Sequence, residues 1–342
     1  MDPYDVIIVG AGPAGLRCAE ILGRSELSVL LLEKQSIVGR KICAGGITRK
    51  GFQLMQFPDS IIEHKVDEVG LHSPGFSNLK KLPGPVMFTV DRKVFGNWQL
   101  ERLQGLNVTF RKNTAVSAVS KDSVITRDDQ VFSFRYLVGS DGPNSLVRKH
   151  LELPVTKLLA TVQYLIPRKN IPSRMDIYLH PKYFHSWYAW SFPHRDHVAV
   201  GACGDPQYLS GSVLKHNFHQ WLQKMDYDVS GAKYESFPIS YDYRGLAFDN
   251  IFLAGEAAGI ASGLTGEGIY QSLVSGEEVA YRIMDSHYRS EDFRFVLKYN
   301  NLQHKFLNFS NRIGPLRYLL GDLLILAMRN GWVNRKISGG FS

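Results

Sequence analysis

The chain has 342 residues, of which 44% are hydrophobic, and its 40 Lys and Arg residues exceed its 32 Asp and Glu residues to give a net charge of +8. This apolar content excludes a disordered chain, and the length suits two domains of roughly 150 residues each. No block of five or more like charges occurs, so a nucleic-acid-binding tail is not indicated. The mild basic excess suits an anionic substrate, an anionic cofactor or a lipid surface.

Cysteine content and hydropathy argue against a disulfide-rich, zinc-binding, secreted or membrane-spanning protein. Cys18, Cys43 and Cys203 are widely spaced, which argues against a disulfide framework and a structural zinc site, so we expect no metal. The first apolar run leads directly into a glycine turn, unlike a signal peptide, and no stretch of 18 apolar residues could span a membrane. We therefore expect a cytoplasmic protein.

The first forty residues predict a strand, a turn, a helix and a second strand. Residues 4–9 form a short apolar run, residues 16–22 have helical spacing, and a buried run over 28–32 ends in Glu33. The turn reads Gly10-Ala11-Gly12-Pro13-Ala14-Gly15. This order of strand, glycine turn, helix, strand and acid predicts a dinucleotide site.

Each residue of this motif has a physical reason. Gly10 permits the sharp turn, Gly12 lets a pyrophosphate approach the backbone, and Gly15 lets helix and strand pack closely. The helix N-terminus then faces the phosphates. Glu33 can accept hydrogen bonds from both ribose hydroxyls of an adenosine and would repel a 2′-phosphate, which disfavours NADP. The motif alone does not separate FAD from NAD.

The later elements predict an interleaved α/β protein. Short strands are expected at 106–110, 115–119, 123–127 and 136–138, an antiparallel sheet from runs at 158–166, 175–179, 187–192 and 197–202, a buried strand at 250–254, and helices over 281–332. We therefore predict a Rossmann-like FAD-binding domain formed by residues 1–55, 100–155 and 245–285. An α+β substrate domain would comprise residues 56–99 and 156–244, and a helical region residues 286–342.

Two later motifs complete a recognisable set. Residues 137–145 read Leu-Val-Gly-Ser-Asp-Gly-Pro-Asn-Ser, and residues 250–258 read Asn-Ile-Phe-Leu-Ala-Gly-Glu-Ala-Ala. With the first motif, they resemble the FAD-dependent hydroxylase-like superfamily. The resemblance implies that the acid of the last motif bonds the ribityl chain or the pyrophosphate of FAD. Its glycines would bring a helix N-terminus to the flavin N1/O2 edge, stabilising an anionic reduced flavin. The superfamily usually has Asp where this chain has Glu256, which predicts weaker FAD binding.

Two further segments resemble the geranylgeranyl reductase family. These are Lys41-Ile42-Cys43-Ala44-Gly45-Gly46 and a Tyr-x-Trp-x-Phe-Pro motif at 188–193. The resemblance covers most of residues 4–280. It implies FAD bound by Gly10, Gly12, Pro13, Ala14, Gly15, Glu33, Lys34, Arg40, Lys41, Ala44, Gly45, Arg92, Ala115, Val116, Asp141, Gly142, Gly255, Glu256, Gly263, Gly266, Gly268 and Ile269. It further implies catalytic residues Cys43, Tyr188 and Trp190 and a substrate pocket at Gly46, Trp187, Phe192 and Pro193.

Several of these residues have a second interpretation. Tyr188, Trp190 and Phe192 alternate, so on a strand they would share one face and form either an apolar wall for an isoprenoid chain or an ordinary core. Cys43 is either a proton donor that shapes the pocket or a small buried residue. Arg92 either bonds FAD or forms a surface ion pair, and Arg40 and Lys41 either meet the pyrophosphate or are solvated.

The resemblance predicts a reductase of isoprenoid C=C bonds. Reduced FAD would deliver hydride to one alkene carbon, and Cys43 or Tyr188 would relay a proton to the other. The isoprenoid substrate would be attached to a diphosphate, an ether phospholipid, a quinone or a chlorophyll precursor. NAD(P)H, ferredoxin or another donor would supply the electrons.

Three points remain alternatives. A flavin monooxygenase or halogenase of the same superfamily is the main rival, and a non-catalytic prenyl-binding protein is another. The apolar run at 313–330 contains Arg317 and Arg329. It either lies on the inner face of a membrane as a peripheral contact, caps a lipid tunnel, or packs as an ordinary helix.

Overall fold

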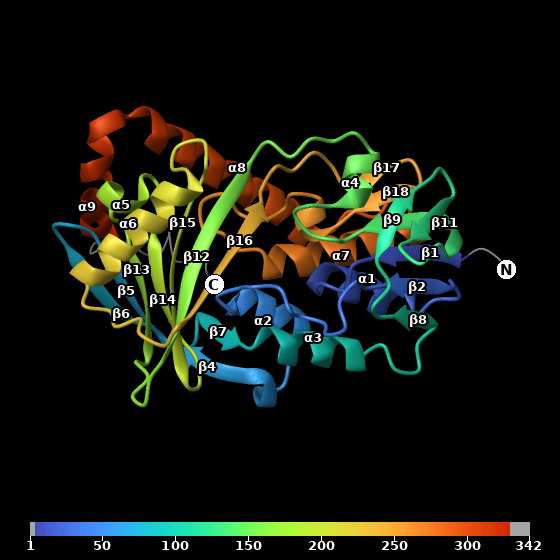
Figure 1. Cartoon of the computed structure of the whole chain (residues 1–342), viewed down its shortest axis with the longest axis horizontal. Helices are drawn as coiled ribbons and strands as arrows, with labels where there is room; N and C mark the ends of the chain where they lie inside the picture. Colours follow the sequence, from blue (N-terminus) through green and yellow to red (C-terminus); the bar gives the residue numbers. More distant parts are fainter. Residues whose placement is uncertain (1–3, 329–342) are drawn as a thin grey trace.

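The computed structural model describes residues 4–328, and its strands form three sheets, with the last helices at one end of the molecule (Figure 1). The first sheet has the order β17-β18-β11-β1-β2-β8, with β10 pairing β11 and β9 pairing β10. The pairs from β18 to β8 are all parallel. Its strands are β1 (Tyr4–Val9), β2 (Val29–Leu32), β8 (Val108–Arg111), β9 (Val116–Val119), β10 (Ser123–Thr126), β11 (Val131–Gly139), β17 (Ala247–Phe248) and β18 (Ile251–Leu253).

The parallel sheet forms because its central strands are apolar on both faces. All four residues of β2 are buried, as are the last four of β1, which is the pattern of a strand covered on both sides. Helix α1 (Pro13–Leu22) packs along α7 (Ile269–Met284), and a Cβ at Gly276 would lie 2.2 Å from the Ala14 carbonyl oxygen. The predicted strand–helix–strand unit is therefore confirmed, and a late segment of the chain covers it.

The second sheet is almost wholly antiparallel. Its order is β16-β12-β15-β14-β13-β5-β6, and the parallel β13–β5 pair is the exception. The strands are β5 (Glu68–His72), β6 (Ser77–Lys81), β12 (Leu158–Pro167), β13 (Arg174–Tyr178), β14 (Ala189–Pro193), β15 (His197–Gly204) and β16 (Lys233–Ser240). The predicted antiparallel sheet is confirmed, although Trp187 and Tyr188, expected within a strand, precede β14.

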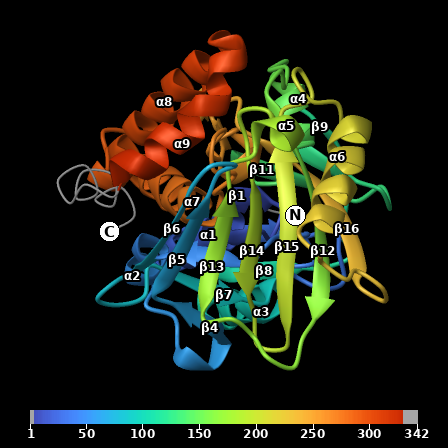
Figure 2. The ribbon, with the colours of Figure 1, turned by 90° about the vertical axis from the view of Figure 1, so that its left-hand side faces the viewer.

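The alternation along this sheet gives it two different faces. Val198, Val200 and Ala202 of β15 pack with α6 (Gly211–Lys224) and α5 (Pro181–Phe184) in one apolar cluster. Cys203 of the same strand belongs to a second cluster with Trp190. Figure 2 shows α6 on one side of these strands, whereas α8 and α9 lie on the other side, toward β5 and β6. One face of the sheet is thus sealed by helices, and the other is left for a site.

A small third sheet and short helices connect the two larger sheets. Its order is β3 (Gly46–Thr48), β7 (Met87–Val90) and β4 (Ile62–Val66). The neighbouring elements are α2 (Arg49–Met55), η1 (Asp59–Ile61), α3 (Arg92–Glu101), α4 (Leu146–His150) and η2 (Gly255–Ala257). Asp91 caps α3 by accepting hydrogen bonds from the backbone N–H groups of Lys93 and Val94. The predicted domain division stays a prediction.

The helical tail is interrupted twice. Helix α8 (Glu291–Arg312) begins after a break from α7, with Ser290 as its N-cap, and η3 (Gly314–Leu316) separates it from α9 (Arg317–Met328). The carboxylate of Asp322 on α9 accepts hydrogen bonds from Ser73 Oγ and from the backbone N–H of Gly75, so α9 is fastened to the β5–β6 turn. Within residues 4–328, no helix is both long and apolar enough to span a membrane. Residues 329–332, predicted as helix, lie outside the described residues.

Candidate active site

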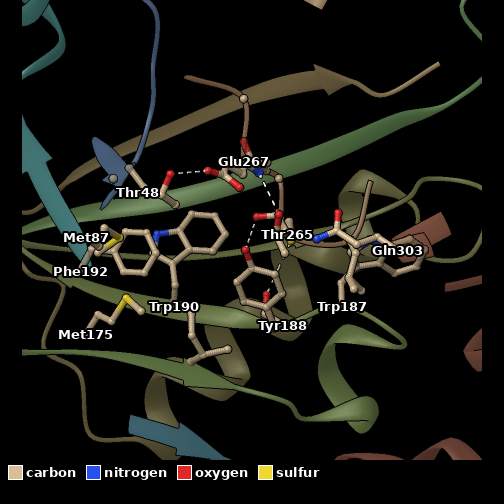
Figure 3. A pocket seen from close by; sticks show the side chains of 18 of the residues that line it. Thr48, Met87, Met175, Trp187, Tyr188, Trp190, Phe192, Thr265, Glu267 and Gln303 are labelled. Atoms are coloured by element: carbon tan, nitrogen blue, oxygen red, sulfur yellow. Dashed lines mark hydrogen bonds between the residues drawn. The ribbon is translucent and has the colours of Figure 1, made fainter. Parts of the chain in front are cut away.

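A cavity of about 920 Å³ lies between the free face of the second sheet, the third sheet and the C-terminal helices. It is lined from β14 by Trp190 and Phe192, from the N-terminus of α7 by Gly268 and Ile269, and from α9 by Leu324. Its size and its apolar walls suit a small-molecule site. Figure 3 shows the aromatic side chains of this cavity close to Glu267 and Thr265.

The predicted aromatic row lines one wall of the cavity. Tyr188 and Trp190 lie edge to face with ring centroids 6.1 Å apart, and Trp190 and Phe192 follow at 6.3 Å. Trp190 fits because its partner in β15 is Gly201, where a Cβ would come within 2.3 Å of the indole. Trp187 Nε1 donates to the Gly263 carbonyl over 2.9 Å. These contacts hold the row as a rigid apolar surface.

The Cys43 segment forms another part of the cavity wall. Cys43 is half-buried and lines the cavity, and its Sγ accepts a hydrogen bond from Gly45 N over 3.4 Å. His194 Nε2 donates to the Ala44 carbonyl over 3.0 Å. Gly45 has a φ of +73°, and a Cβ there would lie 2.5 Å from the Val90 carbonyl oxygen. The thiol is therefore held on a fixed loop that only glycine permits at this position.

The glycine-rich turn leaves the N-terminus of α1 open for an anion. No side chain caps this helix, and its first turn contains no acidic residue. Glu33 accepts hydrogen bonds from Ala11 N and from Gln35 N, both over 2.8 Å. Each of its carboxylate oxygens keeps a further acceptor position, so a ribose hydroxyl can still bind. The arrangement fits the predicted adenosine and pyrophosphate site.

Several buried polar atoms near this turn have no partner within residues 4–328. Among them are Asp141 Oδ1, Arg92 Nε and Glu256 Oε2. Burial raises the pKa of Asp141, whose other oxygen accepts from Leu146 N over 2.7 Å. An unpaired buried polar atom costs about 1–3 kcal/mol, so these atoms are suited to receive the polar groups of a ligand. Two acceptors and one guanidinium suit a group that has both hydroxyls and phosphates.

Lys41 has a partner that the sequence did not predict. Its Nζ forms an ion pair with Glu256 Oε1, and both side chains line the cavity. Neither of the two predicted alternatives for Lys41 included this carboxylate. The pair neutralises the acid that stands where the superfamily usually has Asp.

The structure brings about half of the predicted site residues to one cavity. Those lining it are Pro13, Lys41, Cys43, Ala44, Gly46, Arg92, Trp187, Tyr188, Trp190, Phe192, Glu256, Gly266, Gly268 and Ile269. The others lie outside its lining: Gly10, Gly12, Ala14, Gly15, Glu33, Lys34, Arg40, Gly45, Ala115, Val116, Asp141, Gly142, Gly255, Gly263 and Pro193. Of these, Lys34 and Arg40 are exposed. Among residues 4–328, no three His, Cys, Asp or Glu side chains are grouped to hold a metal.

Sequence reasoning missed Glu267 and Thr48. Both line the cavity, and Thr48 Oγ1 donates to Glu267 Oε1 over 2.9 Å. Burial raises the pKa of Glu267 above its ordinary range. The signal was present, because Glu267 stands between Gly266 and Gly268, two glycines that were predicted to bind the cofactor. An acid between two glycines of a predicted cofactor loop is a signal of a functional carboxyl.

Comparison with other sequences finds relatives that are named as reductases. A model of the Thi4 family matches residues 2–73. Geranylgeranyl diphosphate reductase of Rhodobacter capsulatus is 27% identical over 301 residues, which cover 82% of this chain and 75% of that protein. Digeranylgeranylglycerophospholipid reductase of Methanocella arvoryzae is 28% identical over 299 residues, which cover 80% of this chain and 75% of that protein.

Solved structures share the fold across the whole chain. A geranylgeranyl bacteriochlorophyll reductase-like protein from Thermoplasma acidophilum has a TM-score of 0.75 and 17% identity, covering 100% of both chains. p-Nitrophenol 4-monooxygenase from Pseudomonas putida has a TM-score of 0.76 and 16% identity, covering 98% of this chain and 96% of its own. At these identities the two likenesses establish the fold alone.

Proposed function

The chain belongs to the geranylgeranyl reductase family of FAD-dependent oxidoreductases, and we propose that it reduces C=C bonds of an isoprenoid chain with hydride from reduced FAD. The observation that carries this proposal is the cavity. Its lining includes Arg92 and Glu256 at the predicted cofactor site, the aromatic row, and Leu324 on α9. A large apolar cavity that includes the predicted cofactor site suits a prenyl chain whose double bond must reach the flavin.

The relatives and structural neighbours imply a flavin cofactor, and we infer that it is FAD. The unpaired atoms of Asp141, Arg92 and Glu256 would receive its polar groups, and the open N-terminus of α1 would receive its pyrophosphate. When bound, the reduced flavin supplies a hydride. The surrounding side chains would perform the other parts of the mechanism.

Those side chains position the alkene and exclude water. An isolated alkene is unactivated, so its carbons must be held in near-attack geometry. Trp190 and Phe192, whose ring planes are tilted by 40°, form an aromatic wall whose orientation is set by Gly201 and by the strand pairing. A dry site also limits oxidation of the reduced cofactor by oxygen. The second carbon of the alkene then needs a proton from a protic group in the cavity.

The cavity lining includes two basic residues that suit an anionic head group. Lys80 on β6 and Arg317 on α9 line the cavity, and both are basic. The relatives act, by name, on a geranylgeranyl diphosphate and on a digeranylgeranylglycerophospholipid, and both of these carry phosphate. We infer that the substrate is a prenyl chain attached to a phosphate-containing group.

The ion pair between Lys41 and Glu256 leads to a prediction on cofactor binding. Lys41→Met leaves the Glu256 carboxylate uncompensated beside the FAD pyrophosphate, so the Kd for FAD is expected to rise about tenfold, equivalent to ~1.4 kcal/mol. Fluorescence titration of the apoprotein with FAD measures this. In a Glu256→Gln background the same Lys41 change should have little effect. An equal loss of affinity in both backgrounds would show that Lys41 contacts FAD directly.

A second prediction concerns contact with a membrane, which we propose at α9. Leu319 and Leu323 of this helix are 55% and 60% exposed, while Leu320 and Leu324 line the cavity. Leu319→Ser combined with Leu323→Ser is expected to reduce co-sedimentation with phosphatidylglycerol vesicles about tenfold, because apolar area no longer enters the lipid. Val131→Ser on β11, 58% exposed, is the control. Equal sedimentation of all three proteins would contradict the proposal.

The activity itself is tested with the flavin as reporter. The holoenzyme is reduced with dithionite without oxygen and mixed with geranylgeranyl diphosphate or with a digeranylgeranyl phospholipid in detergent. Reoxidation of the flavin, with a product heavier by two hydrogens per bond reduced, is the expected result. A reduced flavin that neither substrate reoxidises, but that air reoxidises rapidly, would favour the monooxygenase alternative. A protein that remains colourless with added FAD would favour a non-catalytic prenyl-binding protein.

A further inference from the structure

We propose that Glu267 donates the proton that completes alkene reduction and that it is reprotonated through a second, small cavity that it also lines. The inference rests on the proposed reductase function and adds the identity of the acid and the route of the proton. It is carried by the position of one carboxyl between two cavities, of which only the larger can hold a prenyl chain.

The local fold places Glu267 in the wall of the large cavity. It follows Gly266, whose φ is +62°, and precedes Gly268, the N-cap of α7. The residue is half-buried and lines the cavity, and Figure 3 shows its carboxyl beside Thr48 and close to the ring of Trp190. An acid at this position can reach a double bond lying on the aromatic row.

A second cavity, of about 10 Å³, lies behind the carboxyl. Thr48, Glu267 and Tyr299 line both cavities, while Lys50 and Gln271 line only the small one. This volume is about that of one water site, and its walls offer several polar groups. A water there can pass a proton to the side of the carboxyl that faces away from the substrate.

Lys50 lines the small cavity together with Glu267. It is half-buried on α2, and its Nζ lies 3.7 Å from the centroid of the Phe295 ring. Burial lowers the pKa of Lys50. We infer that a proton from solvent passes Lys50 and reaches Glu267 through the water of the small cavity, without crossing the substrate cavity.

The surroundings of Glu267 favour the protonated carboxyl. Burial is the largest effect and raises its pKa, whereas hydrogen bonds from Thr48 and Gln271 and the charge of Lys50 oppose it. The other titratable groups facing it are Tyr188 from the segment before β14, Tyr270 on α7 and Tyr299 on α8. Burial raises the pKa of all three tyrosines, so they stay neutral.

The alternative acids are less suited. The Tyr188 hydroxyl already donates to the Thr265 carbonyl, and burial raises its pKa well above the ordinary value. Burial likewise raises the pKa of Cys203 to about 12. Cys43, the other proton donor that we predicted from sequence, lines the same cavity, and the experiments below compare it directly with Glu267.

The step balances in atoms and electrons. Each reduced bond gains one hydride and one proton, and the reduced flavin is the two-electron reductant. The C=C π bond breaks as the hydride adds to one carbon, and its electron pair forms the C–H bond between the other carbon and the proton of Glu267. The O–H bond of Glu267 breaks, and its electron pair remains on the carboxylate. A proton from solvent then restores the acid through the small cavity.

The test uses the dithionite-reduced holoenzyme mixed with geranylgeranyl diphosphate under anaerobic conditions. Glu267→Gln keeps the shape and the hydrogen bond from Thr48 but removes the proton, so flavin reoxidation by the substrate is expected to slow by at least about 100-fold. FAD content, substrate binding and reoxidation by air should not change. Glu291→Gln, an exposed Glu on α8, is the matched control and should react as the wild type does.

Two further measurements separate this inference from the proposed function. Infrared difference spectra of the wild type against Glu267→Gln should contain the C=O band of one protonated carboxyl, whether or not the substrate reacts. Thr48→Val removes a hydrogen bond that stabilises the carboxylate, so the alkaline limb of the reoxidation rate should move to higher pH. This variant serves if the Gln variant does not fold.

Several results would overturn the assignment. Reoxidation of Glu267→Gln within threefold of the wild-type rate would remove Glu267 as the donor, and a 100-fold loss in Cys43→Ser instead would assign the role to the thiol. An infrared band of an ionised Glu267 carboxylate in place of the protonated one would also remove Glu267 as the donor, even if no prenyl substrate reacts. If prenyl substrates do not reoxidise the wild-type flavin while the C=O band of protonated Glu267 is present, the proposed reductase function is contradicted. The protonation of Glu267 is then still established.

Discussion

Gly10→Ala is expected to purify without bound FAD and to lose about 3 kcal/mol of unfolding free energy. Gly10 has a φ of +101°, and a Cβ there would lie 2.5 Å from the Ser140 carbonyl oxygen. The left-handed backbone costs a side chain ~1–2 kcal/mol, and forcing a methyl against backbone costs ~1–3 kcal/mol more. The two strands that meet at this turn, β1 and β11, cannot move apart without breaking their ladder.

The measurements are the ratio of flavin to protein absorbance and urea unfolding of the apoproteins. Gly105→Ala is the matched control, because Gly105 has a φ of +75° but nothing lies within 4 Å of the added methyl. That variant should lose only the backbone cost, ~1 kcal/mol, and keep its FAD. If both variants behaved alike, the close approach between the turn and Ser140 would not be what shapes the site.

Arg148→Met is expected to destabilise the fold by about 3–5 kcal/mol, the range for breaking a buried charge network. The Arg148 side chain is 1% exposed and donates to four backbone carbonyls, those of Leu153, Pro154, Asp242 and Ala257. These carbonyls belong to three separate segments, and the last lies within η2, next to Glu256. Loss of the guanidinium leaves them buried without a donor, so FAD binding should weaken as well.

Arg244→Met provides the control for this prediction. Arg244 pairs with the Asp242 carboxylate over 3.0 Å, but its side chain is 44% exposed, so its loss should cost no more than ~1 kcal/mol. Urea unfolding of the two variants gives the comparison directly. A loss below ~1 kcal/mol in Arg148→Met would mean that water replaces the guanidinium and that the network does not hold the three segments together.

Local sequence patterns predicted the elements of the first sheet well. The bounds expected for Tyr4–Val9 are those of β1, and the strand before Glu33 differs from β2 by one residue. Runs of apolar residues buried on both faces, joined by a glycine turn, allow few other structures. The segment over residues 41–105 was different. Its strands β4 to β6 are partly exposed and rich in polar residues, and β7 is buried but only four residues long, so no clear periodicity marked them.

The candidate site was predicted in its parts but not as a whole. Cys43 and Trp190 were named from motifs, and the structure places both on one cavity. The ion pair of Lys41 and Glu256 joins residues 215 positions apart, and Thr48 and Glu267 are 219 apart. No pattern within either segment contains the other, because such pairs depend on how β3 and α7 pack.

What the sequence determined by itself was local: the glycine turn, the acid after β2, the spacing of the aromatic row and, by resemblance, the class of cofactor. These depend on backbone conformations and side-chain periods that a short segment sets alone. The tertiary structure decided which charges are paired and which are buried. Glu267 is an ordinary acid in the sequence and becomes a candidate proton donor only because α7, α2 and β3 enclose it. Desolvation is a property of the surroundings and not of the residue.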